Sequence, residues 1–127
     1  MNFLLDTHAF VWFVNGDRSL PDRVVAKIRK VENRCFLSIA SIWEIAIKMK
    51  LNKIQLKSDF NEIAYICNAN EIEILPITFE HLQELNRLDL HHGDLFDRLI
   101  IAQGLTDDLA IITKDSAFEP YGAKLLW

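Results

Sequence analysis

Two carboxylates three residues apart, Asp94 and Asp97, stand where a polar loop gives way to an apolar run, within residues 91–104. If a helix begins at Asp94, both side chains fall on one side of its first turn, against the positive end of the helix dipole. Such a pair can be the N-cap and the N3 residue of a helix, or it can supply half of a metal site. The other acids of the chain bear on which interpretation holds.

Three further acids occupy positions suited to a shared site. Asp6 and Asp115 each follow a short apolar run, and Glu44 lies among apolar residues. Each has an ordinary structural explanation, because an aspartate after a strand often forms a turn. Glu44 can likewise pair with Lys48 one helical turn further on. A glutamate buried without a partner is costly, however, and so many acids in one small chain favour a common site.

Grouped carboxylates have a definite chemistry. They repel one another and raise one another's pKa, and a bound divalent cation removes that cost. Mg²⁺ and Mn²⁺ prefer carboxylate and water oxygens, and no paired cysteines or histidines compete for the role. A metal held in this way activates water and stabilises charge on a phosphodiester. The acids therefore predict metal-assisted hydrolysis of a phosphate ester.

The elements that must position these acids alternate between strands and helices. This order predicts an α/β fold with a mainly parallel sheet covered on both faces, in one domain spanning residues 1–127. Ligands of such folds collect at the carboxyl ends of the strands, where Asp6, Asp97 and Asp115 can converge. We expect strands over 2–5, 35–38, 71–76, 109–112 and 124–127, and helices over 8–15, 21–31, 39–50, 59–69, 79–88 and 94–105. Residues 117–118 form a short helical turn, and residues 120–122 a turn.

Composition limits the partners and the compartment. The net charge of −4 gives no overall attraction to nucleic acid, so any such binding needs a local basic patch or metal ions. Cys35 and Cys67 are predicted to be buried apolar residues, which suits a reducing cytosol. The N-terminus lacks a basic segment typical of signal peptides, and no apolar run approaches about 20 residues. We therefore expect a cytoplasmic protein. A candidate basic patch is formed by Lys48, Lys50, Lys53 and Lys57, which is otherwise a solvated face.

The histidines have weaker signals. His8 is predicted to be packed and His81 to lie on the surface. His91 and His92 are adjacent and point apart, so a solvated loop is favoured over a metal site. The predicted core face of the helix after Thr78 carries Phe79, Leu82, Leu85 and Leu88.

Taken together, the motifs resemble those of PIN-domain ribonucleases, and among them the VapC-like toxins of bacterial toxin–antitoxin pairs. The resemblance covers nearly the whole chain in the family's order and spacing. Two positions depart from the pattern without touching a ligand position: Leu95 stands where proline is common, and Gly104 where a small helix former is usual. The segments that carry the resemblance are Leu4-Leu5-Asp6-Thr7-His8, residues 38–45, residues 92–103, Ile112-Thr113-Lys114-Asp115 and Leu125-Leu126-Trp127.

The resemblance implies a three-layer α/β/α fold, Mg²⁺ or Mn²⁺ as cofactor, RNA as substrate, a homodimer and a small cognate antitoxin. Asp94 would be an extra acid beside the family's metal site, and Thr113 would support the site through its hydroxyl. Alternatives are a catalytically silent RNA- or protein-binding module and another Mg²⁺-dependent phosphohydrolase, although the latter lacks an Asp-x-Asp motif. The residues implied as catalytic are Asp6, Glu44, Asp97 and Asp115, and those implied as metal ligands are the same four with Asp94.

Overall fold

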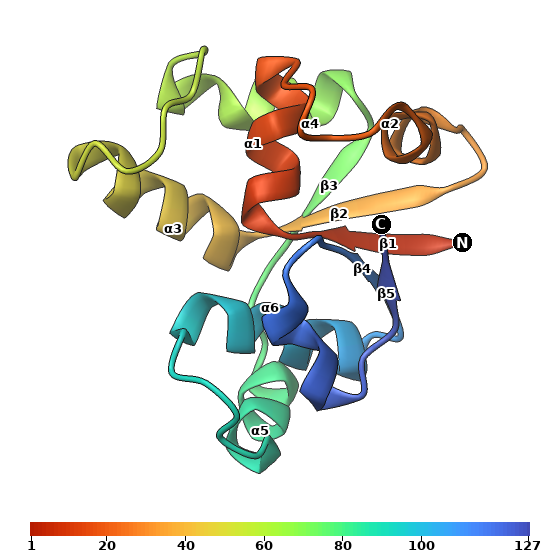
Figure 1. Ribbon diagram of the computed structural model, residues 1–127, viewed down its shortest axis with the longest axis vertical. Coiled ribbons are helices and arrows are strands. Elements are labelled where there is room, and N and C mark those ends of the chain that lie inside the picture. Colours follow the sequence, from red (N-terminus) through yellow and green to blue (C-terminus); the bar gives the residue numbers. More distant parts are fainter.

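The computed structural model describes residues 1–127 and contains one five-stranded sheet (Figure 1). The strands are β1 (Asn2–Leu5), β2 (Arg34–Ser38), β3 (Ile72–Leu75), β4 (Ala110–Ile112) and β5 (Leu125–Leu126). They lie in the order β3-β2-β1-β4-β5, and every neighbouring pair is parallel. The predicted α/β class is confirmed. The carboxyl ends of all five strands consequently lie along one edge.

Helices cover both faces of the sheet, which confirms the three-layer arrangement. In Figure 1, α1 to α4 lie on one side of the sheet and α5 and α6 on the other. The helices are α1 (Thr7–Asn15), α2 (Asp22–Arg29), α3 (Ile39–Lys50), α4 (Ile63–Ala69), α5 (Phe79–Arg87) and α6 (Leu95–Thr106). Two 3-10 helices, η1 (Phe60–Glu62) and η2 (Ser116–Tyr121), complete the chain. Residues 120 and 121 thus end a 3-10 helix rather than form the separate turn that was expected.

The alternation of side chains along β1 explains the two cores. Phe3 and Leu5 point into the larger core, which they share with Phe10 of α1. Leu4 points the other way and packs with Ile100 of α6. All of these side chains are almost fully buried. A strand that is apolar on both faces is typical of a parallel sheet between helical layers, and β1 is the central strand of this sheet.

The orientation of α5 differs from the prediction. Phe79 and Leu82 are largely exposed, whereas His81 is buried. The cause is a capping box: the Thr78 hydroxyl accepts the His81 N–H at 3.3 Å, and His81 Nδ1 accepts the Thr78 N–H at 3.0 Å. His81 Nε2 also lies 2.9 Å from a carboxylate oxygen of Asp107. These bonds satisfy the ring in the interior, and the helix turns its apolar residues at positions 79 and 82 outward.

Gly104 lets α6 approach β4 closely. A Cβ atom at this position would lie 2.9 Å from Cδ1 of Ile111 and 3.3 Å from the Leu109 carbonyl oxygen. Because Ile111 is fully buried, its side chain has little room to move. The close approach explains why a residue that is poor for helix propensity stands inside α6.

We expect Gly104→Ala to lower the free energy of unfolding by about 1 kcal/mol, because overpacking outweighs the helix propensity of alanine. Chemical denaturation would measure the change. The double variant Gly104→Ala/Ile111→Val removes the methyl group that the new Cβ meets, so it should recover part of the loss relative to Ile111→Val alone. A stabilised Gly104→Ala protein would contradict the packing argument.

The two cysteines are free and buried, as predicted. Burial raises the pKa of both thiols to about 11, so neither is poised for reaction. None of the helices has the length and apolar character that crossing a membrane requires.

Candidate active site

Asp6 directly follows β1 and caps α1. Its Oδ1 accepts the Ala9 N–H at 2.7 Å, and the side chain is buried. Burial raises the pKa of Asp6, while hydrogen bonds from Thr113 and Ala9 oppose the shift. The negative charge of Asp115 adds to the rise. Asp6 is therefore held in one orientation at a place where its charged form is costly.

Asp115 follows the neighbouring strand β4, which brings it to the same edge. Its Oδ1 accepts the Ala117 N–H at 2.9 Å at the start of η2. The buried Thr113 hydroxyl accepts the Asp115 N–H at 3.1 Å, so one threonine contacts the backbone of one acid and the carboxylate of the other. Asp6 and Asp115 line one cavity of about 360 Å³, together with His8, Trp12, Lys114 and Ser116.

Asp94 and Asp97 have different surroundings, although both open α6. Asp94 is the cap, because its Oδ1 accepts the Asp97 N–H at 2.9 Å. The Asp97 side chain is mostly buried, and its pKa is raised to about 7. Burial is the main cause, the charge of Asp94 adds to it, and a hydrogen bond from His92 opposes it. Glu44 and Asp115 also contribute repulsion. The cap and the site thus coexist on one helical turn.

Glu44 of α3 is the most deeply buried of these acids, with 2% of its surface exposed. Its Oε1 accepts the Thr7 hydroxyl at 2.5 Å, and its Oε2 pairs with Lys48 Nζ at 2.5 Å. The Thr7 hydroxyl also lies 3.0 Å from that of Ser41. Glu44 therefore has a partner for each oxygen, including the lysine that its spacing suggested.

Lys48 is a cation already present beside the acids. Burial tends to lower its pKa, but Glu44, Asp94 and Asp97 together raise it above the ordinary lysine value.

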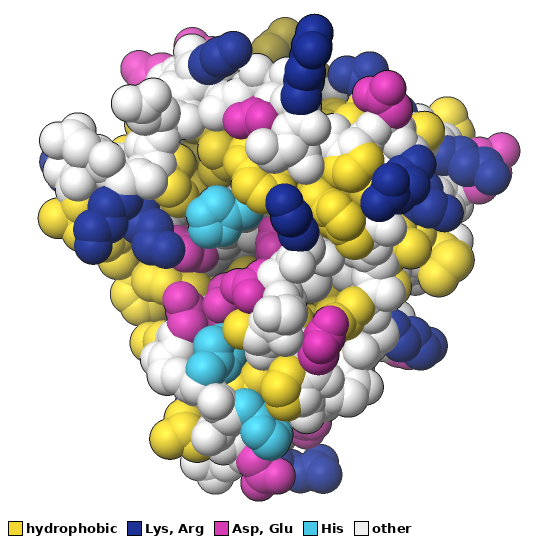
Figure 2. Space-filling model, viewed as in Figure 1, with side chains coloured by type: hydrophobic (Ala, Val, Ile, Leu, Met, Phe, Trp, Pro, Cys, Tyr) yellow, Lys and Arg dark blue, Asp and Glu magenta, His cyan; other side chains and the backbone are white.

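The surface of the site is acidic at its centre. Acidic side chains gather at the middle of one face next to histidines, with basic side chains around them (Figure 2). No three of the aspartate, glutamate, histidine and cysteine side chains are close enough to enclose a metal ion in this arrangement.

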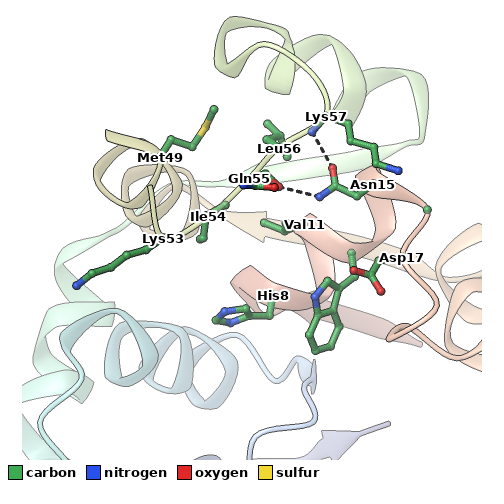
Figure 3. A pocket seen from close by; sticks show the side chains of 12 residues that line it. His8, Val11, Asn15, Asp17, Met49, Lys53, Ile54, Gln55, Leu56 and Lys57 are labelled. Carbon is green, nitrogen blue, oxygen red and sulfur yellow. Dashed lines mark hydrogen bonds between the residues drawn. The ribbon is translucent and has the colours of Figure 1, made fainter. Parts of the chain in front are cut away.

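A groove of about 730 Å³ runs along α1 next to the acidic site. Figure 3 shows its two walls: His8, Val11 and Asn15 on α1 face the connection after α3. The Asn15 amide donates to the Gln55 carbonyl at 2.8 Å, and its oxygen accepts the Lys57 N–H at 2.9 Å. His8 and Trp12 line both this groove and the cavity beside Asp6, so the two hollows adjoin at these side chains.

Two histidine predictions were wrong, and one contact was missed. His8 is exposed at the junction of groove and site, not packed, and His81 is buried, not on the surface. His92 is half-buried and contacts both Asp97 and Tyr121. Because the tyrosine lies 29 residues further along the chain, no local spacing could have revealed that contact.

The comparison with protein families decides the identity of this arrangement. A model of the PIN domain matches residues 3–124, nearly the whole chain. The chain belongs to the PIN domain family. PIN domains are typically nucleases and are generally metal-dependent. No curated protein matches the sequence.

Solved structures share the fold of this PIN domain at low identity. A chain of VapBC2 from Rickettsia felis, bound to a DNA fragment from the promoter, has a TM-score of 0.74 at 15% identity, covering 99% of this chain and 98% of that one. A chain of VapBC-1 from nontypeable Haemophilus influenzae has a TM-score of 0.70 at 16% identity, covering 99% and 97%. A chain of FitAcB from Neisseria gonorrhoeae has a TM-score of 0.68 at 16% identity, covering 100% and 97%.

The acids of this PIN domain fit a hard divalent cation by their chemistry. All are carboxylates, and their oxygens are the ligands that Mg²⁺ and Mn²⁺ prefer. The pKa values of Asp6 and Asp97 are raised mainly by burial and further by repulsion from neighbouring acids, so the charged forms are costly here. A divalent cation would remove that cost. Lys48 pairs directly only with Glu44 and so neutralises only part of the charge.

Proposed function

We propose that this PIN domain, residues 1–127, is a metal-dependent endoribonuclease that hydrolyses RNA phosphodiester bonds. The observation that carries the proposal is Asp97, a mostly buried carboxyl with a pKa near 7 among other acids at the carboxyl edge of the sheet. Asp6 and Asp97 are the principal ligands of Mg²⁺ or Mn²⁺. Glu44 and Asp115 complete the catalytic set, and Asp94 adds charge at the edge of the metal site.

The chain's own residues prepare this site. Thr113 and the Ala9 amide hold Asp6, and Thr7 holds Glu44, so each of these two carboxylates has a fixed orientation. Lys48 limits the repulsion around Glu44. When bound, the metal lowers the pKa of a water ligand and stabilises the charge of the phosphate. Carboxylates that are already oriented by the protein favour catalysis, because fewer groups must be ordered when the site is loaded.

The biological role we propose is that of the toxin of a toxin–antitoxin pair, acting in the cytoplasm and inhibited by a small antitoxin. The support is the resemblance of the sequence motifs to VapC-like toxins, together with the similarity of the fold to the solved structures of VapBC2, VapBC-1 and FitAcB. We also propose a homodimer. Its support is a stripe of exposed apolar residues at four-residue spacing along α3 and at its C-cap, beside α6. The stripe consists of Ile39, Trp43, Ile47 and Leu51, and the Trp43 ring packs at 5.2 Å against Phe96.

The test is cleavage of single-stranded RNA by the purified protein with Mg²⁺ or Mn²⁺, with and without excess EDTA. We expect internal cuts that EDTA abolishes and that added metal restores. A phosphomonoester offered in parallel should be left intact. Cleavage that survives EDTA would refute the metal mechanism. RNA binding without cleavage in any divalent ion would favour a silent binding module, and turnover of the phosphomonoester alone a different phosphohydrolase.

The groove along α1 is our candidate binding path for the RNA strand next to the acids. Lys53 and Lys57 are exposed on its rim, and Trp12 lines it next to the site. Contacts from such lysines to the RNA phosphates contribute affinity but no sequence specificity. We therefore expect Lys53→Glu/Lys57→Glu to weaken RNA binding at low salt by at least tenfold. The slope of log affinity against log salt should fall by about 1.4, at about 0.7 for each lost contact.

Filter binding in the Asp97→Asn background would measure this without cutting the RNA. The matched control is Lys27→Glu/Lys30→Glu, because these lysines are exposed on or just after α2 and do not line the groove. It makes the same change in net charge, so it removes the general electrostatic effect. Equal losses in both double variants would contradict a role for the groove.

A further inference from the structure

The loop before α6 is tied to the C-terminal part of the chain at one tyrosine. The Tyr121 hydroxyl oxygen accepts the backbone N–H of His92 at 3.2 Å and lies 2.5 Å from His92 Nδ1. The other ring nitrogen, Nε2, lies 3.4 Å from Asp97 Oδ2. A chain of contacts therefore runs from Tyr121 through the imidazole to the acid that the proposed function places at the metal.

The proton count fixes the direction of these bonds. Ionised Asp97 can only accept, so Nε2 must carry the proton that faces it. A neutral imidazole has a single ring proton, which leaves Nδ1 as an acceptor. The Tyr121 hydroxyl supplies the matching donor, and its oxygen remains free to accept the His92 N–H. Each of the three hydrogen bonds then contains one proton, and the Asp97 carboxylate, the imidazole and the Tyr121 hydroxyl are all satisfied.

Packing keeps the tyrosine in place. Its ring contacts that of His91 edge-on at 4.9 Å and that of His92 at 5.4 Å. The ring also packs against the smaller hydrophobic core, which includes the fully buried Phe118 of the same 3-10 helix. Since Gly122 follows in the left-handed region, with φ of 75°, the chain turns sharply after Tyr121 towards β5. The hydroxyl therefore projects from a rigid part of the fold.

We propose that Tyr121 and His92 are positioning residues, which hold the Asp97 carboxylate by hydrogen bonding to Oδ2 and leave Oδ1 free for a divalent cation. Asp97 Oδ1 accepts no hydrogen bond from the protein, which leaves it open to a cation. The 3.4 Å separation is longer than an optimal bond of about 2.9 Å, and such contacts commonly shorten once a site is loaded. Partners of this kind fix ligand orientation and tune metal affinity. The inference rests on the proposed metal-dependent function.

The first test concerns the metal-free protein. Long-range ¹⁵N–¹H spectra in alkaline buffer distinguish a protonated ring nitrogen from an acceptor. We expect Nε2 of His92 to carry the proton, and the Nδ1 resonance to shift in Tyr121→Phe, where the hydroxyl donor is lost. Tyr65→Phe is the matched control, because Tyr65 is exposed and makes no side-chain hydrogen bond. A proton on Nδ1, or no shift in Tyr121→Phe, would overturn the inference.

The second test is Mn²⁺ affinity by calorimetry. His92→Ala should weaken binding by about 10- to 100-fold, the usual effect of losing a group that orients a ligand. Tyr121→Phe should weaken it by about 2- to 10-fold, as expected for one hydrogen bond. His92→Gln places an amide N–H near the position of Nε2 and should recover most of the affinity. A merely structural role for His92 predicts no such rescue.

The outcomes separate this inference from the proposed function. If the wild-type protein and all three variants bind Mn²⁺ equally well, the positioning role is wrong while the metal site stands. If the wild-type protein binds no Mn²⁺, both the metal site and the positioning role are wrong. Thermal unfolding without metal should show similar stability for His92→Ala and His92→Gln, which keeps an affinity difference from reflecting misfolding.

Discussion

Asp97→Asn is expected to remove metal-dependent RNA cleavage while stabilising the metal-free protein. The cleavage rate should fall by on the order of 10³-fold, because the metal's contribution of several kcal/mol depends on a charged ligand. Asparagine keeps the size of the side chain, and the backbone N–H of residue 97 can still bond Asp94. The start of α6 is therefore preserved, and the loss reports on charge.

The stability effect has the opposite sign. The pKa of Asp97 rises from 3.8 to about 7 on folding, so between these values the folded protein binds more protons than the unfolded chain. The stability of the metal-free protein therefore decreases as pH rises from about 4 to about 7, and the full cost remains above that range. Asp97→Asn removes the cost, which should raise the free energy of unfolding at pH 8 by about 1 kcal/mol, since solvent screens a partly buried carboxyl.

Urea unfolding at pH 5 and pH 8, with EDTA or with Mg²⁺, would measure both trends. Mg²⁺ should stabilise the wild-type protein at pH 8 and have little effect on Asp97→Asn. Asp89→Asn is the control, because this exposed aspartate in the same loop has no side-chain hydrogen bond and should change neither activity nor stability. Full cleavage by Asp97→Asn, in EDTA as well as in Mg²⁺, would contradict the role of the acid.

Most of the fold could be predicted because local patterns determine it. The helix expected over residues 39–50 has the same bounds as α3, since Ser38 caps its start and its apolar residues keep a helical period up to the cap at Leu51. The short strand runs are apolar on both faces, as buried parallel strands must be. The sequence pattern also placed Asp6 and Asp115 after two predicted strands at one edge of the sheet, because parallel strands share one carboxyl edge. The structure adds that these strands, β1 and β4, are neighbours.

Contacts between distant segments could not be predicted in the same way. Nothing in the sequence around His81 indicates that the carboxylate of Asp107, 26 residues later, accepts a hydrogen bond from its ring. His92 likewise depends on Tyr121 for its orientation, and Glu44 on Thr7 for one of its two partners. In each case a polar side chain is buried because a partner from another element satisfies it, and only the folded arrangement reveals that partner.

Replacing Lys48 tests the role of Glu44. In the present arrangement one lysine pairs with Oε2 of the buried glutamate and neutralises its charge. We expect Lys48→Met to lower the free energy of unfolding in EDTA by about 2 kcal/mol, because a buried carboxylate loses its cation. Methionine retains most of the apolar stem, so packing is little changed. Mg²⁺ or Mn²⁺ should then restore stability and bind more tightly than to the wild-type protein.

Lys50→Met is the matched control, since Lys50 is exposed at the end of α3 and forms no ion pair. It should alter neither stability nor metal affinity. The double variant Glu44→Gln/Lys48→Met removes both charges, so it should be more stable in EDTA than Lys48→Met and should lose the gain from metal. If Lys48→Met is destabilised and metal restores nothing, Glu44 is only the structural partner of the lysine. Recovery by metal would instead make Lys48 an internal cation that competes with the divalent ion for Glu44.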